Sequence, residues 1–92
     1  MFEIEKTTNY RFQYNRLELR FKRFVDEAIE IIKEFPTDYQ GKITHLANKK
    51  DGRMYRYRLP GCYLIYVLPE TVQEEENGTL ILTGVKMLYQ RK

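Results

Sequence analysis

Two arginines stand in an alternating segment near the middle of the chain. Arg56 and Arg58 are separated by one residue, so in a β-strand both side chains project from one face, about 6–7 Å apart. Two guanidinium groups placed in this way can grip adjacent phosphates or brace one scissile phosphate. The alternative is an ordinary solvated strand face, because charged sheet surfaces are common.

The charge around these arginines is strongly uneven. Residues 42–66 hold six bases against Asp51 alone, giving +6 − 1 = +5, whereas residues 70–76 hold four glutamates and no base, giving −4. A basic stretch with interspersed tyrosines suits a polyanion, because cations neutralise phosphates and rings stack on bases. We therefore predict contacts with such a polymer, RNA being the candidate, at Lys49, Lys50, Arg53, Tyr63 and Arg91, although Tyr63 can point to either face of its strand.

Further candidates lie outside this segment or are isolated within it. Lys86 ends the last predicted strand and joins Arg56 and Arg58 if the strands are neighbours. Tyr89 and Arg91 belong to a basic tail that either folds over the same face or is a frayed end. His45 is a possible general acid or base, or simply a surface residue.

Metal and cofactor chemistry finds little support in the sequence. Cys62 is the only cysteine and His45 the only histidine, so an internal disulfide and a cysteine zinc site are excluded and too few ligands remain for a transition metal. The chain has no P-loop, no GxGxxG turn and no Ser-His-Asp set, and we expect no cofactor.

The first third of the chain predicts a strand and then helix. Phe2 and Ile4 alternate with glutamates, and a helical apolar stripe then runs to Phe35-Pro36, where proline forces the preceding residue out of the helix. One long helix, two helices with a tight turn near Asn15, or a coiled-coil seam would each fit, and covering a sheet is the preferred interpretation. The stripe consists of Tyr10, Tyr14, Leu17, Phe21, Phe24, Ala28, Ile31 and Phe35, widened by Val25 and Ile32.

The remainder predicts consecutive strands, which makes residues 1–92 a single α+β domain with an antiparallel sheet of three to four strands. We expect the almost wholly apolar strand to be central and buried on both sides. No apolar run is long enough to span a membrane and no signal-peptide core is present, so we expect a cytoplasmic protein. The predicted strands are Ile43–Leu46 at an edge, Met54–Leu59, the apolar Cys62–Leu68, and Thr79–Lys86 after an acidic loop.

This succession resembles the RelE/ParE toxin superfamily. The features that carry the likeness are the helix ending at Pro36, His45-Leu46, and three strand motifs. In that superfamily a strand with alternating basic residues precedes a Gly-Tyr-Arg-Leu-Val-Tyr-like strand and an apolar strand ending in Gly and a basic residue. The matching motifs here are Tyr55-Arg56-Tyr57-Arg58, Gly61-Cys62-Tyr63-Leu64-Ile65-Tyr66 and Ile81-Leu82-Thr83-Gly84-Val85-Lys86.

The resemblance implies a toxin of a type II toxin–antitoxin pair that cuts mRNA on the ribosome without a metal. In RelE-like members the 2′-hydroxyl attacks the neighbouring phosphate and leaves a 2′,3′-cyclic end. By position, Arg56 and Arg58 would match two strand lysines that brace the phosphate. Lys86 would match the basic residue after the last strand, whose positive charge stabilises the transition state. Tyr89 would match a C-terminal tyrosine that stacks on a base or assists proton transfer. An antitoxin protein, the ribosome and mRNA are the partners so implied.

Departures from the family pattern leave other functions open. Tyr63 stands where RelE-like members usually have arginine, and arginine is a poor general base, so the two strand arginines weaken a proton-transfer role. Either Tyr63, His45 or Arg91 fills this gap, or catalysis is absent. The alternatives are a ParE-like toxin that acts on DNA gyrase without cutting RNA, and a non-catalytic module that binds nucleic acid or protein.

Overall fold

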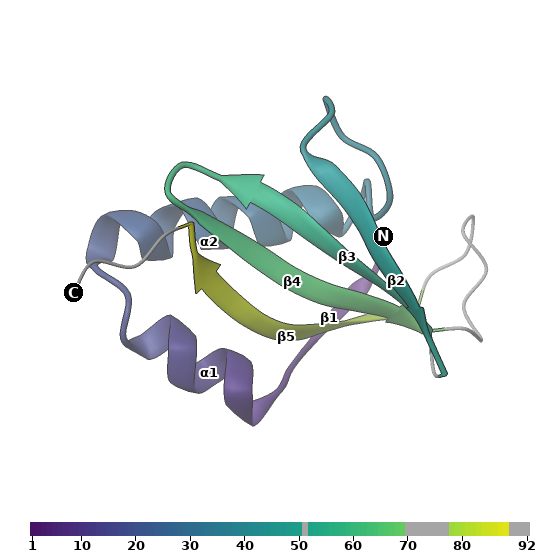
Figure 1. Ribbon diagram of the computed structural model, residues 1–92, viewed down its shortest axis with the longest axis horizontal. Helices are drawn as coiled ribbons and strands as arrows, with labels where there is room; N and C mark the ends of the chain where they lie inside the picture. The colour runs from purple at the N-terminus through teal and green to yellow at the C-terminus, as the bar shows by residue number, and fades with distance from the viewer. Residues whose placement is uncertain (51, 70–77, 89–92) are drawn as a thin grey trace.

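The computed structural model describes residues 1–50, 52–69 and 78–88. Two helices pack on a five-stranded sheet of order β1-β5-β4-β3-β2 (Figure 1), which confirms the α+β prediction. The predicted antiparallel strands are β2 to β5, and β1 extends the sheet by pairing in parallel with β5. The elements are β1 (Glu3–Lys6), α1 (Thr8–Asn15), α2 (Leu19–Ile32), β2 (Ile43–Lys49), β3 (Gly52–Leu59), β4 (Cys62–Pro69) and β5 (Thr79–Met87).

The helical stripe forms two helices, as one of the three interpretations predicted. Thr7 caps α1 by accepting a hydrogen bond from the Tyr10 amide over 3.1 Å, and residues 16–18 separate α1 from α2. The buried face of α2 is made of Val25, Ala28, Ile29 and Ile32. Its centre therefore lies on the positions that widened the stripe, and Phe35, beyond the helix, is 46% exposed.

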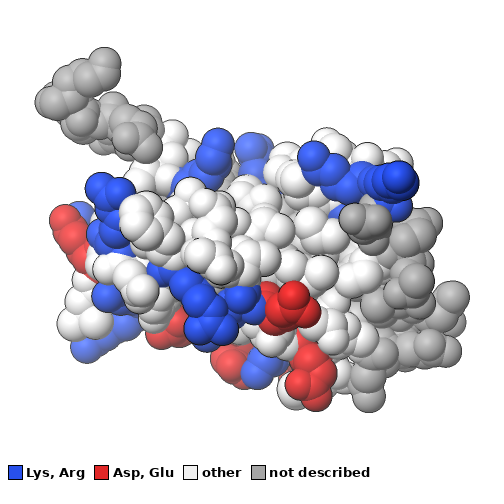
Figure 2. Space-filling view, turned by 90° about the horizontal axis from the view of Figure 1, so that it is seen from below, with Lys and Arg blue, Asp and Glu red and all other residues white. Residues whose placement is uncertain are grey.

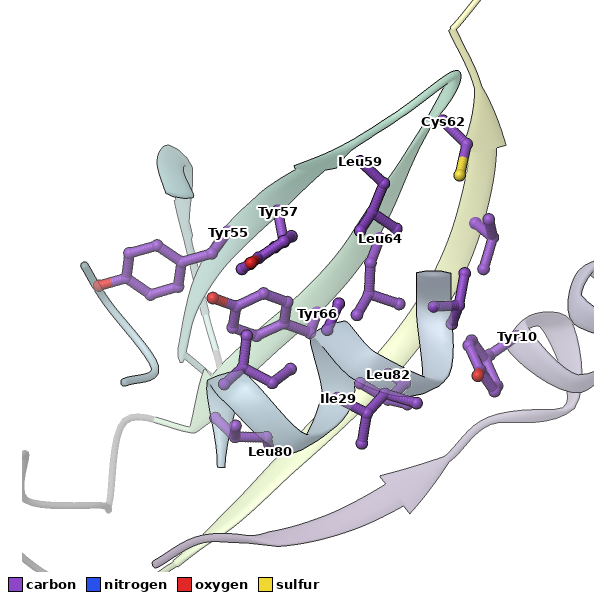
Figure 3. Packing of buried hydrophobic residues seen from close by; sticks show 14 of the residues in the cluster. Tyr10, Ile29, Tyr55, Tyr57, Leu59, Cys62, Leu64, Tyr66, Leu80 and Leu82 are labelled. Atoms are coloured by element: carbon purple, nitrogen blue, oxygen red, sulfur yellow. The ribbon is translucent and has the colours of Figure 1, made fainter. Parts of the chain in front are cut away.

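One face of the sheet carries the core. Inward side chains of β3, β4 and β5 pack against α2, which lies behind the sheet in Figure 1, and the labelled tyrosines and leucines of Figure 3 fill the space between them. The prediction that Cys62–Leu68 is buried on both sides was wrong, because Tyr63, Ile65 and Val67 are only half-buried. The described helices leave the other face of this central strand open, and we call it the open face.

Stacked tyrosines extend the core toward the end of α2. The rings of Tyr55 and Tyr66 lie 5.8 Å apart and those of Tyr39 and Tyr57 6.5 Å apart. The hydroxyl of Tyr66 donates a hydrogen bond to the carbonyl oxygen of Pro36 over 2.6 Å, which ties the α2–β2 connection to the centre of the sheet. Burial raises the pKa of Tyr66 well above its usual range, because the charged phenolate would lose its hydration there.

We expect the Tyr66→Phe variant to be less sensitive to alkaline pH than the parent. Because the folded-state pKa of Tyr66 is raised, its contribution to stability is complete below the unfolded value of about 10 and is lost as pH rises above it. At neutral pH the variant should lose about 1 kcal/mol with the bond to Pro36. Urea unfolding between neutral and strongly alkaline pH measures both effects. An unchanged slope of stability against pH would contradict this account of Tyr66.

Candidate nucleic-acid interface

Three strands bring their outward side chains into one row across the open face. In the register of the sheet, Arg58 of β3 lies opposite Tyr63 of β4, and Tyr63 lies opposite Lys86 of β5. Neighbouring strands are about 4.8 Å apart, so the backbone positions of Arg58 and Lys86 are separated by about 10 Å. Both cations are exposed and Tyr63 between them is half-buried. The strands β3 and β5 are not neighbours, because β4 lies between them, so Lys86 shares the open face with Arg58 at a distance of two strand spacings.

Arg56 joins this row through the ring of Tyr63. Its guanidinium carbon lies 4.4 Å from the ring centroid, a cation–π contact between diagonal neighbours on β3 and β4. The contact holds the long arginine side chain over the sheet and makes a flat surface of guanidinium and phenol. Tyr63 therefore points to the open face. The sequence alone did not decide to which face of the strand this side chain points.

A fourth cation belongs to the same row and was missed as a site residue in the sequence. The Arg58 amide donates a hydrogen bond to the Lys42 carbonyl over 2.8 Å, which places Lys42 directly beside Arg58 just before β2 begins. Because Ile43 packs toward the core, alternation puts Lys42 on the open face. The alternation of Lys42 with the apolar Ile43 was the sequence signal that could have identified Lys42 as a site residue. We call Lys42, Arg56, Arg58, Tyr63 and Lys86 the basic row.

His45 does not join the basic row. It pairs with Tyr55, whose side chain is in the core, and the two rings lie 5.2 Å apart on the face that α2 covers. Its Nε2 atom is 3.0 Å from the Asn48 amide oxygen. Side chains alternate along a strand, so a residue paired with Tyr55 faces away from Arg56 and Arg58. The geometry separates the predicted acid/base candidate from the arginines.

The other predicted RNA contacts form a separate group. Lys49, Lys50 and Arg53 line a shallow depression together with Asn48 at the tip of the β2–β3 hairpin. Arg53 precedes Arg56 by three residues along β3, about 10 Å at the strand rise. Tyr89 and Arg91 lie outside the described residues. Arg53 pairs with the buried Leu68, so alternation puts Arg53 on the face opposite Arg56, and the hairpin tip is a second basic cluster separate from the row.

The view from below shows how charge is spread around the molecule. Basic side chains line the upper border of Figure 2, which is the side that faces the reader in Figure 1, and others lie at the left and in the middle, whereas most acidic ones lie in the lower half. Of the carboxylates in the described part of the chain, Glu3 and Glu5 of β1 share the open face, and Glu5 pairs with Ile81, five residues along β5 from Lys86. The basic row itself contains no carboxylate and no imidazole.

Lys86 also borders a groove beside the sheet. The groove lies between α1, the start of α2 and the end of β5, and Phe12, Phe21, Met87 and Leu88 give it an apolar lining. Phe12 is 60% exposed and Leu88 47% exposed, so much of this lining is open to water. Arg16 stands over the Phe12 ring at 5.3 Å and adds a second cation to the rim.

Two kinds of site find no geometric basis in the part of the chain that is described. Its residues include no group of three or more His, Cys, Asp or Glu side chains placed to hold a metal ion. Neither described helix has the length and apolar character needed to cross a membrane. What the basic row offers chemically is a set of cations and one aromatic platform, which suits a phosphate-bearing polymer.

Two helices on a mostly antiparallel sheet form an α+β arrangement, and this arrangement is the RelE-like fold. This chain is similar to a chain in the crystal structure of the archaeal RelE–RelB complex from Pyrococcus horikoshii OT3, with a TM-score of 0.74. The likeness covers 94% of this chain and 93% of that chain, at 16% sequence identity. Searches of family models and of curated proteins found no match. The expected fold is therefore confirmed by structure rather than by sequence similarity.

We expect the Arg58→Gln and Lys86→Gln variants to bind a single-stranded oligonucleotide more weakly than the parent. Each lost phosphate contact should reduce the slope of log affinity against log salt by about 0.7. Fluorescence anisotropy titrations at several salt concentrations measure this slope. Arg23→Gln is the matched control, because Arg23 is an exposed arginine on α2, outside the basic row. Equal slopes in all variants would remove the basic row as the binding surface.

Proposed function

We propose that this chain is the toxin of a type II toxin–antitoxin pair and that its basic row holds mRNA on the ribosome, in the cytoplasm, for cleavage. The observation that carries the proposal is the convergence of Arg56, Arg58 and Lys86 on one face, around Tyr63. The RelE-like fold supports it, because the similar chain comes from a RelE–RelB complex. The hairpin-tip cluster provides a second contact for the ribose-phosphate backbone.

In the proposed reaction the ribose 2′-oxygen attacks the adjacent phosphorus. A bond forms between the 2′-oxygen and phosphorus, the bond to the 5′-oxygen breaks, and the products are a 2′,3′-cyclic phosphate and a 5′-hydroxyl. Negative charge grows on the non-bridging oxygens, and Arg58 and Lys86 on either side of Tyr63 would stabilise it. Arg56, stacked on Tyr63, would hold the neighbouring phosphate.

Proton transfer is the demanding part of this mechanism. One proton must leave the 2′-hydroxyl and one must reach the departing 5′-oxygen. Arginine is a poor base, and His45 lies on the opposite face of the sheet, so we assign to the Tyr63 hydroxyl the donation of a proton to the departing 5′-oxygen, while a water molecule would take the proton of the 2′-hydroxyl. Tyr89 and Arg91, from the tail, remain the proposed stacking and RNA-contacting residues.

Expression in growing bacteria tests the proposal directly. We expect growth arrest and codon-phased mRNA cuts that end in 2′,3′-cyclic phosphates, mapped by sequencing RNA ends. Arg58→Gln and Lys86→Gln should each slow cleavage by about 100-fold, the effect of losing about 3 kcal/mol of transition-state stabilisation. Arg23→Gln should cut at the parental rate. Cleavage at full rate in both row variants would refute the assignment of Arg58 and Lys86.

A second function is favoured by one observation. The basic row lacks a carboxylate and an imidazole, and Tyr63 stands where the RelE-like pattern has arginine. That composition suits a ParE-like toxin that binds and poisons DNA gyrase without cutting RNA. In the same expression experiment, DNA breaks and SOS induction with intact mRNA would favour this function. Unaffected growth would favour a non-catalytic binding module.

The groove is where we place the antitoxin. Its apolar lining, with Arg16 and Lys86 as cations against the one carboxylate of Glu18, suits an amphipathic segment that carries acidic side chains next to its apolar ones. Lys86 borders both the groove and the basic row, so a partner seated there would compete with RNA for this cation. Neutralisation of the toxin would follow from that shared residue.

We expect the Phe12→Glu variant to lose affinity for the antitoxin by at least tenfold, because it places a carboxylate in the exposed apolar lining. Co-purification with the product of the neighbouring reading frame, followed by isothermal titration, measures the loss. Phe35→Glu is the matched control, since Phe35 is also exposed but lies outside the groove. Equal binding by both variants would place the antitoxin elsewhere. RNA binding should be retained in both.

A further inference from the structure

An irregularity in β5 decides on which face Lys86 lies. Ile65 of β4 pairs with Gly84 and the next residue, Tyr66, pairs with Leu82, so Thr83 is one extra residue in β5. Such a bulge reverses the phase of alternation beyond it. Leu80 and Leu82 face the core before the bulge, and so does Val85 after it, which leaves Lys86 on the open face.

The alternative register is costly, and this explains why the bulge forms. Without it, Val85 would lie opposite Tyr63 on the open face, and Lys86 would lie opposite Cys62, which is 0% exposed. An ammonium group would then be buried and an apolar side chain exposed to water. The hydrophobic pattern therefore selects the bulged register.

Side chains of α1 hold the bulge from the edge of the sheet. The Asn9 side-chain amide donates a hydrogen bond to the Thr83 carbonyl over 2.7 Å, and the Gln13 side-chain oxygen accepts one from the Val85 amide over 2.7 Å. The strand β1 pairs with β5 only as far as Leu82. The α1 side chains thus supply hydrogen bonds where β5 has lost its strand neighbour on that side.

Gly84 allows this close approach. A β-carbon added at Gly84 would lie 2.7 Å from the Gln13 side-chain oxygen and 3.3 Å from the Asn9 amide nitrogen. Any larger residue would push these two side chains away from the strand. On the β4 side, the Thr83 hydroxyl donates to the Ile65 carbonyl over 3.2 Å, so the bulge is bonded on both sides.

We infer that Asn9 and Gln13 are positioning residues that hold the bulged end of β5 so that Lys86 stays opposite Tyr63. They act through the backbone of Thr83 and Val85 and need not touch the ligand. Their importance for RNA rests on the proposed function, whereas the clamp itself can be tested without RNA. The helix α1 then has a role in the site beyond covering the sheet.

Hydrogen exchange tests the clamp. In the Gln13→Ala variant the Val85 amide should exchange at least tenfold faster than in the parent, and the cross-strand nuclear Overhauser contacts between Tyr63 and Lys86 should weaken. Gln13→Glu keeps an acceptor at the same position and should retain both signals. Asn15→Ala, an exposed amide on the same helix, is the control. Parental exchange at Val85 in Gln13→Ala would overturn the inference.

A double-mutant cycle connects the clamp to binding. Gln13→Ala should weaken binding of a single-stranded RNA oligonucleotide several-fold, and the double variant with Lys86→Gln should bind no more weakly than Lys86→Gln alone. Fully additive losses would show that Gln13 does not act through Lys86. If Lys86→Gln alone binds like the parent, the proposed function fails, while the exchange result still decides the clamp.

Gly84→Ala gives an independent measurement on the same contact. This variant should lower the melting temperature by several degrees, because the new methyl group meets the Gln13 side chain. In a Gln13→Ala background, which removes that side chain, the loss should be less than half as large. An equal loss in both backgrounds would contradict the proposed contact.

Discussion

Burial of one sheet face beneath α2 is the constraint on which the rest of the structure depends. Val25 and Ile32 of α2 and Leu64, Tyr66 and Leu82 of the sheet are all 0% exposed in one core. Side chains alternate along a strand, so fixing these residues inward fixes their neighbours outward. Burial of the apolar side chains therefore also fixes which residues lie on the open face. The arginines point outward because their neighbours in the strand are buried, and no additional interaction is required.

The cations of the open face are left available for a ligand. The basic row forms no ion pair with a described carboxylate, and the ion pairs Arg20–Glu18 and Lys33–Glu30 lie in the helical part of the chain. Instead, Arg56 is held by the ring of Tyr63, which keeps its charge while restricting its motion. Among the described residues, no ion pair would have to break before a polyanion reached these cations. The single aromatic platform between the charges suits a strand with exposed bases.

Fold and chemistry contribute separately to the functional argument. The fold is shared with a chain of the archaeal RelE–RelB complex at 16% identity, a level at which side chains in a site need not be kept. This chain has a row of cations on its open face, and the row contains neither an imidazole nor a carboxylate. The groove beside Lys86 adds an apolar surface of the kind that partners cover. The described surface therefore has groups suited to binding a phosphate-bearing polymer and a protein partner, whereas the row has no imidazole or carboxylate for proton transfer.

Local patterns in the sequence determined much of this protein. The period-two alternation of residues 54–59 put Arg56 and Arg58 on one face, and the spacing of the apolar stripe predicted helices that cover a sheet. Only the tertiary structure decided that Tyr63 faces the row, that Lys42 joins it and that His45 does not. Lys86 is the clearest case, because alternation from Leu82 would have placed it in the core, and the bulge at Thr83 returns it to the open face. Alternation within one strand follows from local backbone geometry and can be read from neighbouring residues. Register between strands depends on residues that are distant in the sequence, here Ile65, Asn9 and Gln13.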